Sequence, residues 1–564
     1  MLSVGNRPVL IPGLLLAGAL IVYLLPAPWR RARRLGAAAV LVLAAWVALS
    51  IAPSTSSGPV VSSFGNAVPG VALALRADQT GLALLLMALT AALFALGAAD
   101  RRPGEEAALL LTAAGAALAA LAGNLVILFA GAEIASLGGL LLATAGRGRV
   151  SPGAATAFTI QHVFALGLLV AAVELTVATG TSNPFAVPAS AVGLSVALPW
   201  GLAGAGRLVA AGWWPGAAGG RSTRSWLAIG AVPCAAAILL RLDTAIGGAA
   251  DPGLTIPLAV FGAAVALFGA VSAWRWKHES RRAGRALLGA SAGTLVAVGV
   301  LPDGAGAFAA GVVALELALL AAPAWSQPVR PSRRGRTLAA TALAAAGGLP
   351  IGFGTTAAVL ELGAVAALGR PYTPLLLVLG MAAVAAAGGG LVAARQALGS
   401  AATADPPGTP PRPPGGSVPV RPDAILALAL GAVAALVPGI VGAVVLAPLV
   451  GSAAPVAIDA ATLHGPGGPW PGGYLSLALL LVLLGVASAG LVLGRPLPHP
   501  AHGEGGPRPR PSWVALVGPR RALGPVARQL GRALTGIDSW LVVQPGLVFT
   551  VIVALAALIL FHYV

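Results

Sequence analysis

The chain has 564 residues, of which 58% are apolar and only 9% are charged. The apolar residues form long runs without strand-type alternation, which excludes a membrane β-barrel and indicates an all-α, polytopic membrane protein. The net charge of +17 does not indicate nucleic-acid binding, because the basic residues lie between the apolar runs, and the single cysteine, Cys234, excludes disulfides and iron–sulfur clusters held by this chain alone.

About sixteen apolar runs are long enough to cross a bilayer as helices. The first, from about Val9 to Leu25, serves as an uncleaved first span. The expected spans are centred near residues 17, 44, 88, 114, 133, 166, 200, 232, 264, 293, 314, 352, 385, 436, 483 and 553.

The basic residues predict the orientation of these spans, because Arg and Lys accumulate in cytoplasmic loops. With the N-terminus outside, the loops after odd-numbered spans are cytoplasmic, and they hold nearly all of the basic residues. The outer loops hold only Arg7, Arg76 and Arg370, while Arg207 and Arg241 lie within spans or at their ends. Both termini are therefore predicted to lie outside. The basic cytoplasmic groups are Arg30 to Arg34, Arg101 and Arg102, Arg147 and Arg149, Arg221 and Arg224, Arg275 to Arg285, Arg330 to Arg336, Arg395 to Arg421, and Arg495 to Arg532.

The chain divides into six segments. Residues 1–70 hold spans 1 and 2 with an outer loop, and 71–400 form a core of spans 3–13. A Pro/Gly-rich cytoplasmic linker at 401–422 precedes spans 14 and 15 at 423–495, a basic segment at 496–543 and the last span at 544–564. Within the basic segment, Val514–Trp540 is predicted to be an interfacial amphipathic helix interrupted by Gly–Pro, the alternative being a basic loop at anionic headgroups.

Ionisable groups at membrane depth are the candidate functional residues, because each costs at least ~2.5 kcal/mol to insert and such groups usually face a bundle interior. Glu133 is the least ambiguous, since it stands in the middle of an otherwise apolar span and needs a proton or a cationic partner. The full set of pathway candidates is Glu133, Arg207, Glu316, Glu361, Arg395 and His162, with Glu174 on the same span as His162.

Four segments, in order along the chain, resemble one known family. RADQTGLALLLMALTAALFAL (Arg76–Leu96) resembles its third span, and NLVILFAGAEIASL (Asn124–Leu137) its fifth, which carries a central glutamate. AAGWWPGAAGG (Ala210–Gly220) resembles the loop after the seventh span, and GGLPIGFGTTAAVLELGAVAALG (Gly347–Gly369) the discontinuous twelfth. The family is that of the antiporter-like membrane subunits shared by respiratory complex I, hydrogenase-4 and formate hydrogenlyase complexes, and Mrp-type cation/proton antiporters.

This resemblance, which runs from about residue 70 to 400, implies two inverted five-helix repeats with discontinuous helices. It also implies ionisable residues along the midplane that relay protons, and other membrane subunits of a multisubunit redox complex as partners. Such a chain holds no flavin, metal, quinone or other cofactor of its own, and it lies in a bacterial cytoplasmic membrane.

The sequence also departs from the family pattern. Relay lysines on the seventh and later spans are absent, since the only lysine, Lys277, lies in a cytoplasmic loop. Arg207 stands near the seventh-span lysine position, where it could pair with Glu133, but arginine is a poor proton carrier. Leu320 falls where a relay lysine would be, and Trp214-Pro215-Gly216 lacks the family aspartate.

Two interpretations of Glu133 remain open: a proton acceptor in a half-channel, or a carboxylate that only neutralises Arg207 and locks two spans together. Glu316 and Glu361 are favoured as hydrogen-bonded packing residues or as residues near a water cavity, and His162 as a packed or water-bonded histidine, over membership of a relay. Asp78 is expected to cap a helix at the outer surface.

The favoured function is a membrane-arm subunit of a complex I-like or hydrogenase-linked redox complex, which takes part in proton or cation translocation with a reduced or rerouted relay. As an enzyme component it would be a translocase subunit without a redox centre. The alternatives are a stand-alone or Mrp-like secondary transporter and a non-pumping scaffold. A glycosyltransferase acting on lipid-linked sugars is disfavoured, because the first outer loop contains no acid before Asp78.

Overall fold

The computed structural model describes residues 7–399 apart from 27, 69–70, 98–103, 146–151, 214–225, 248–250, 277–278, 303, 327–332 and 350–353, together with 425–426 and 428–430. The predicted linker, the spans predicted near 436, 483 and 553, and the basic segment lie outside the described residues.

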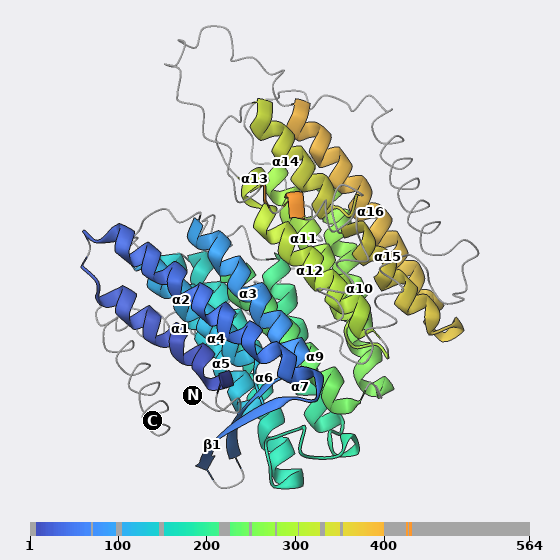
Figure 1. The fold of residues 1–564 in the computed structure, drawn as a ribbon. Helices are drawn as coiled ribbons and strands as arrows, with labels where there is room; N and C mark the ends of the chain where they lie inside the picture. The colour runs from blue at the N-terminus through green and yellow to red at the C-terminus, as the bar shows by residue number, and fades with distance from the viewer. Residues whose placement is uncertain are drawn as a thin grey trace.

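Long apolar helices make up nearly all of the described chain, and most of them run roughly side by side (Figure 1). The first part comprises α1 (Arg7–Leu24), α2 (Arg30–Ile51), strands β1 (Val60–Val68) and β2 (Val71–Ala77), α3 (Gln79–Gly97), α4 (Glu105–Ala120), α5 (Leu125–Thr144), α6 (Pro152–Thr179), α7 (Leu194–Trp213), the π-helical turn η4 (Leu227–Ala231) and α9 (Val232–Ile246). The second part comprises α10 (Pro252–Arg275), α11 (Ser280–Val298), α12 (Ala305–Ala321), α13 (Pro323–Ser326), α14 (Arg333–Ala346), α15 (Gly354–Ala367) and α16 (Thr373–Gly399).

These helices agree with the first thirteen predicted spans. Of the helices described, ten are long and apolar enough to cross a membrane by length and composition. The span predicted near 352 is interrupted, since α14 ends at Ala346 and α15 begins at Gly354, on either side of the undescribed residues 350–353. This break matches the discontinuous twelfth span that the resemblance implies. In contrast, α7 is unbroken from Leu194 to Trp213.

A two-stranded antiparallel hairpin, which the sequence did not predict, occupies the outer loop between α2 and α3. Val60 of β1 pairs with Ala77 of β2, and the register shifts on either side of Asn66. The hairpin also joins the loop between α4 and α5, because the Gly123 amide donates to the Ala74 carbonyl at 2.9 Å. The hairpin therefore forms a cap on one end of the helices.

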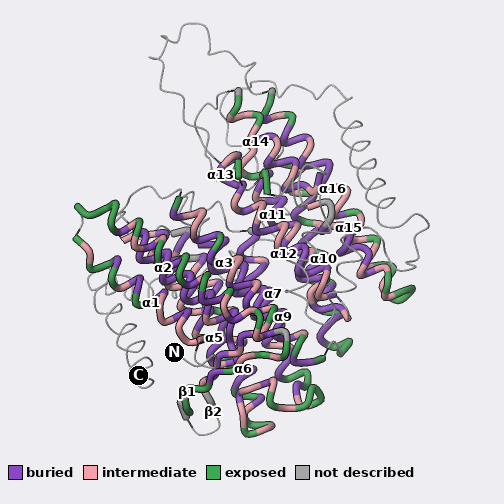
Figure 2. The backbone as a smooth tube through the Cα atoms, viewed as in Figure 1, coloured by how far each residue is buried: buried purple, intermediate pink, exposed green. Residues whose placement is uncertain are grey.

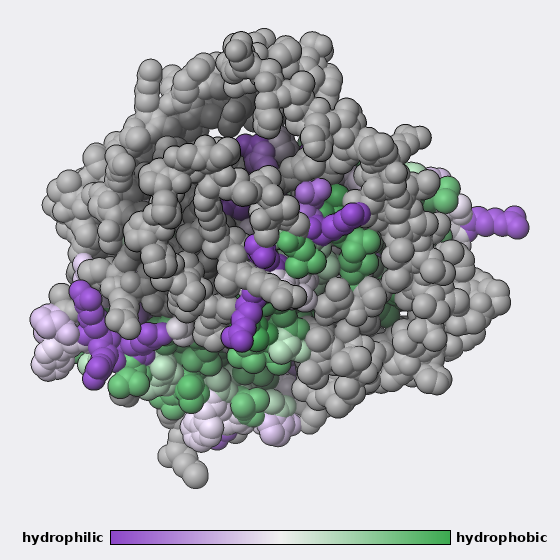
Figure 3. Space-filling model, turned by 90° about the horizontal axis from the view of Figure 1, so that it is seen from above, coloured by the Kyte–Doolittle hydropathy of each residue, from purple (hydrophilic) through white to green (hydrophobic). Residues whose placement is uncertain are grey.

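Contacts between loops agree with the prediction that successive loops lie alternately on the two sides of the membrane. At the end that carries the hairpin, the Leu125 amide donates to the Ser182 carbonyl at 3.2 Å, which joins the start of α5 to the loop after α6. At the opposite end, the Arg34 guanidinium donates to the Gly97 carbonyl at 2.5 Å, joining α2 to the end of α3. On the face seen from above, Figure 3 shows hydrophilic and hydrophobic side chains next to each other in the described part of the chain.

Glycines allow two similar helix crossings, one in each part of the chain. A Cβ atom on Gly131 of α5 would collide with the Ala119 amide of α4, and a Cβ on Gly293 of α11 would collide with the Ala266 amide of α10. The backbones of α4 and α5, and of α10 and α11, therefore approach unusually closely, as small residues permit in membrane helices. The repetition of this crossing agrees with the expected pair of five-helix repeats.

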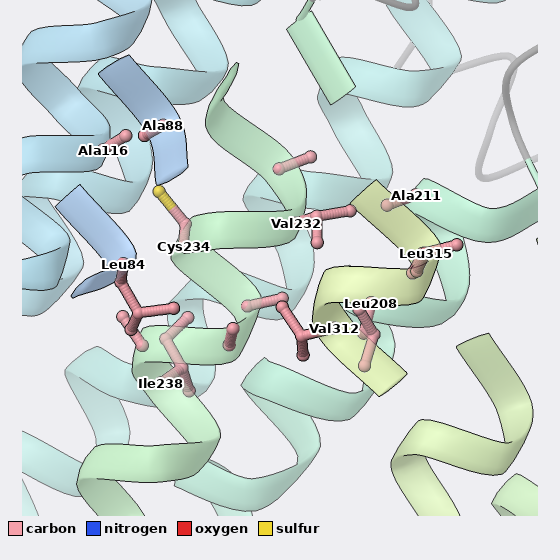
Figure 4. Packing of buried hydrophobic residues seen from close by; sticks show 14 of the residues in the cluster. Leu84, Ala88, Ala116, Leu208, Ala211, Val232, Cys234, Ile238, Val312 and Leu315 are labelled. Atoms are coloured by element: carbon pink, nitrogen blue, oxygen red, sulfur yellow. The ribbon is translucent and has the colours of Figure 1, made fainter. Parts of the chain in front are cut away.

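Helix α9 lies at the centre of the first part and also contacts the second. Figure 4 shows Cys234 of α9 beside Ala88 and Ala116, from α3 and α4, while Val312 of α12 lies on another side of α9. The segment from Leu227 to Ile246 is almost entirely buried, whereas α6 exposes a broad apolar face (Figure 2). The buried core is therefore continuous from α3 to α12.

Candidate functional site

The central pair of ionisable residues joins α5 to α6. Oε2 of Glu133 lies 2.5 Å from Nδ1 of His162, and the rings of His162 and Phe158 stack with their centroids 6.0 Å apart. At this distance one proton is shared between the two groups: either Nδ1–H donates to the carboxylate, or a carboxylic acid donates to the bare nitrogen. The contact therefore links an acidic side chain of α5 to a basic side chain of α6 through one hydrogen bond.

Arg207 lies next to this pair but does not bind the carboxylate. Its guanidinium is completely buried and donates to the Gln161 carbonyl at 2.9 Å, the Ala132 carbonyl at 3.1 Å and the Ser136 hydroxyl at 3.0 Å. The direct Glu133–Arg207 ion pair expected from the sequence is therefore not formed. The sequence could not show this, because the partner of each group depends on how the three helices are rotated about their axes.

Three buried polar atoms in this neighbourhood have no hydrogen-bond partner among the described residues: Oε1 of Glu133, Oε1 of Gln161 and Nε of Arg207. An unsatisfied buried polar atom costs about 1–3 kcal/mol, and native proteins keep few of them. The three unpaired atoms lie close to Glu133 and make this part of the apolar bundle polar. A water molecule or a transferred proton would be stabilised there.

Glu361 lies on α15, just after the break between α14 and α15, and faces a cavity. The cavity has a volume of about 80 Å³, and Ser291 and Thr294 of α11 contribute to its wall. Glu361 is 6% exposed, and its Oε1 packs against Gly311 of α12. Because a water molecule needs roughly 10–15 Å³ of such space, the cavity has room for several waters beside the carboxylate.

Glu316 lies on α12 and is 3% exposed, with neither carboxylate oxygen hydrogen-bonded. Hydrogen-bonded packing by the described residues is therefore not seen at Glu316, and a position near a water cavity stays a prediction. Burial of an unpaired carboxylate is costly, so this position is a second polar spot in the second part of the chain.

The remaining candidates lie apart from these groups. Arg395 is exposed near the end of α16, and Glu174 is exposed on α6. The Trp214-Pro215-Gly216 segment lies outside the described residues. Where the chain is described, no three His, Cys, Asp or Glu side chains converge as metal ligands would.

Asp78 caps α3 as expected, and it also anchors a charged cluster at the hairpin end. Its Oδ1 accepts from the Gly81 amide at 2.8 Å, and its Oδ2 accepts from Arg76 at 3.1 Å and from the buried Arg241 of α9. Both guanidinium groups lie over the ring of Phe185. Burial by itself raises the pKa of Asp78, but Arg241, the Gly81 amide and Arg76 outweigh burial and hold the pKa below its usual value of 3.8.

Sequence reasoning missed two members of the central site, Ser136 and Gln161. Ser136 follows Glu133 by three residues and Gln161 precedes His162, so their proximity to candidate residues was a usable signal. Each is a neutral polar residue in an apolar span, which by itself predicts no specific role.

No protein-family model matches this sequence, and no curated protein matches it. Several solved structures match in fold. One is the structure of the Mrp complex from Dietzia sp. DQ12-45-1b, with a TM-score of 0.66 and 20% identity, over 97% of this chain and 63% of that one. Another is an archaeal membrane-bound sulfane sulfur reductase, with a TM-score of 0.58 and 16% identity, over 99% of this chain and 96% of that one.

A chain of respiratory complex I from Thermus thermophilus matches with a TM-score of 0.55 and 19% identity, over 82% of this chain and all of that one. This chain spans 63% of the Mrp chain and nearly the full length of the other two. All three belong to multisubunit membrane complexes. The chain is therefore a multi-pass membrane protein that shares its fold with chains of Mrp, sulfane sulfur reductase and complex I assemblies.

Proposed function

We propose that this chain is a membrane-arm subunit that conducts protons across a bacterial cytoplasmic membrane as part of a complex I-like or hydrogenase-linked complex. The observation that carries the proposal is the 2.5 Å contact between Glu133 and His162 beside unsatisfied polar atoms. Ionisable residues at membrane depth are retained chiefly where they move ions or protons. A redox partner drives the movement, and this chain contributes no redox centre.

The proton path continues into the second part of the chain through carboxylates. Glu316 and Glu361 lie on α12 and α15, and the cavity at Glu361 offers room for water. Arginine keeps its proton under physiological conditions, so Arg207 supplies a fixed positive charge near Glu133 and does not relay. The relay therefore uses carboxylates, His162 and water where the family uses lysines.

The partners of this subunit are other membrane subunits, one of which packs on α6. His162 is 43% exposed on that helix, and Val163, Val170 and Val173 beside it are also about half exposed. A titratable pair facing lipid would be costly, whereas a neighbouring subunit with a polar residue at this depth would complete the path. In that arrangement, the proton path passes from one subunit to the other through Glu133 and His162.

Proton flux under an imposed voltage tests this function without knowledge of the electron donor. The complex is purified through this chain and reconstituted in vesicles, and a potassium diffusion potential drives proton uptake that a pH-sensitive dye reports. Glu133→Gln removes the proton-accepting group, and we expect its initial rate to fall at least about tenfold, since positioned acid–base groups contribute ~10²–10⁴ to proton transfer.

Glu174→Gln is the matched control, because it makes the same chemical change on an exposed side chain of α6. It should conduct within about twofold of the wild type. Equal rates for Glu133→Gln and the wild type, with normal assembly, would exclude Glu133 as a proton carrier and favour a non-pumping scaffold.

An Mrp-like secondary transporter is the second candidate, because this chain shares its fold with a chain of the Mrp complex at a TM-score of 0.66. Its signature is proton movement driven by a sodium gradient, without any redox substrate. The same vesicles, loaded with sodium and diluted into sodium-free buffer, distinguish it. Sodium-driven flux that Glu133→Gln abolishes would assign the chain to that class.

A further inference from the structure

A charged hollow of about 550 Å³ lies at the turn between α1 and α2. Figure 1 shows the ends of these two helices at the left edge of the described chain. The lining of the hollow includes Trp29, Arg30, Arg31 and Arg34 at the start of α2, and Glu106 near the start of α4. We propose that this hollow binds the phosphate headgroup of an anionic phospholipid. The proposal does not depend on proton transport by this chain.

The arginines of this turn divide into two that fix the backbone and two that are available to a ligand. Arg33 donates to the Leu25 carbonyl, and Arg34 donates to the Gly97 carbonyl at 2.5 Å, so the turn is held to α1 and to the end of α3. Arg30 and Arg31 have no hydrogen bond or ion pair with any described residue. The turn thus presents two guanidinium groups, which are well suited to binding the oxygens of a phosphate.

The net charge of the lining favours an anion. Glu106 is the one acidic residue among the lining residues, and three arginines oppose it. Its side chain is 6% exposed and forms no ion pair with these arginines. Two positive charges therefore remain in excess.

The hollow lies at the depth of lipid headgroups, because it is between the end of one membrane span, Leu24, and the start of the next, Arg30. Trp29 is 58% exposed, as is typical of aromatic residues at a membrane interface. Next to the turn, Leu24 and Leu35 are 69% and 71% exposed, and they offer an apolar surface to acyl chains. A soluble phosphate would use the arginines alone, whereas a phospholipid uses both surfaces.

The test measures lipid binding to the purified full-length chain by native mass spectrometry and by thermal stabilisation in detergent. The probes are phosphatidylglycerol, phosphatidylcholine with the same acyl chains, and glycerol 3-phosphate. Basic residues near a membrane surface contribute about 1 kcal/mol each. The double variant Arg30→Gln/Arg31→Gln should therefore bind phosphatidylglycerol about 30-fold more weakly, which is about 2 kcal/mol at 1.4 kcal/mol per tenfold.

The matched control is Arg334→Gln/Arg336→Gln, which removes two charges from α14 at the same predicted side of the membrane. It should bind phosphatidylglycerol as the wild type does, and Arg30→Lys/Arg31→Lys should retain most of the binding because it keeps the charge. Equal wild-type affinity for both lipids, or equal losses in the two glutamine doubles, would overturn the proposal. Binding of glycerol 3-phosphate as tight as that of the lipid would also overturn it. An assembly defect of Arg30→Gln/Arg31→Gln with unchanged lipid affinity would overturn it too, and would assign the arginines to an acidic protein partner.

Discussion

The guanidinium of Arg207 is permanently charged and lies inside the bundle, where the dipoles of its hydrogen-bond acceptors stabilise the charge. Its acceptors are two backbone carbonyls and one hydroxyl, from α5 and α6, so one side chain of α7 holds both neighbouring helices. The Glu133 carboxylate, which lies next to Ala132 in sequence, is thereby left to interact with His162. The Arg207 guanidinium and the Glu133 carboxylate thus lie near each other, but each is hydrogen-bonded to other groups.

Arg207→Lys tests the structural role of this guanidinium. Lysine keeps the charge but lacks the planar fork that reaches three acceptors in two helices. We expect a loss of about 3 kcal/mol of stability, in the range for a broken buried charged network. The measurement is maleimide labelling of Cys234, the only cysteine, which is fully buried and reacts only when the protein opens. Labelling in mild denaturant as slow as in the wild type would contradict this role.

The Asp78 cluster predicts a definite dependence of stability on pH. Asp78→Asn leaves Arg241, only 3% exposed, without a charged partner, and should cost about 3 kcal/mol at neutral pH. Since the pKa of Asp78 is lowered on folding, its contribution is complete above the unfolded value near 3.8 and is lost as pH falls through the lower, folded value.

Thermal unfolding of the wild type and Asp78→Asn between pH 3 and 7 measures this contribution. The difference in stability between the two proteins should be constant above about pH 5 and should shrink below about pH 4. A difference that widens as the pH falls would show that Asp78 does not act as an ionised carboxylate.

Residue identity predicted which groups are chemically important but not how they pair. Glu133 and Arg207 stand out in the sequence because charges are rare in apolar spans. The pairing of Glu133 with His162 depends on how α5 and α6 are rotated about their axes. When every face of a helix is hydrophobic, its sequence does not show which face meets the neighbouring helix. The favoured interpretation of His162 as a packed histidine missed this contact.

At the scale of elements, the two glycine crossings predict matched effects in the two parts of the chain. Gly131→Ala places a methyl group against the backbone of α4, and Gly293→Ala places one against the backbone of α10. Overpacking of this kind costs about 1–3 kcal/mol, so both variants should unfold at lower temperature than the wild type.

Gly380→Ala is the control, because a Cβ atom on this glycine of α16 meets no atom within 4 Å. It should be as stable as the wild type, or slightly more so, since alanine favours helix. If Gly131→Ala is as stable as Gly380→Ala, then the close approach of α4 and α5 does not constrain the fold.

Elements were predictable where hydrophobicity alone defines them. Each of the first thirteen spans was placed from its apolar run, and the break near residue 350 followed from the resemblance to a discontinuous helix. The hairpin was missed because VALALRA (Val71–Ala77) is apolar and joins directly to α3, so the sequence did not separate strand from span. Its stability depends on contacts with the loop between α4 and α5, which are remote in sequence.

At the scale of the whole molecule, the chain places the hydrogen-bonded Glu133–His162 pair at its α5–α6 edge and two further carboxylates in its second part. The nearly buried α9 lies between them and contacts α12 as well as α3 and α7. This arrangement supports a lateral path from the Glu133–His162 pair towards Glu316 and the cavity at Glu361. This path requires first that Glu133 and His162 share one proton.

A double-mutant cycle on proton flux tests that requirement most directly. Glu133→Gln, His162→Gln and the double variant are compared in the reconstituted complex under the same potassium diffusion potential. If the two residues share one proton, each single variant loses at least about tenfold in rate and the double variant is no slower than Glu133→Gln alone, because residues in one network are not additive. Losses that multiply in the double variant, or a His162→Gln variant that conducts as well as the wild type, would contradict the account.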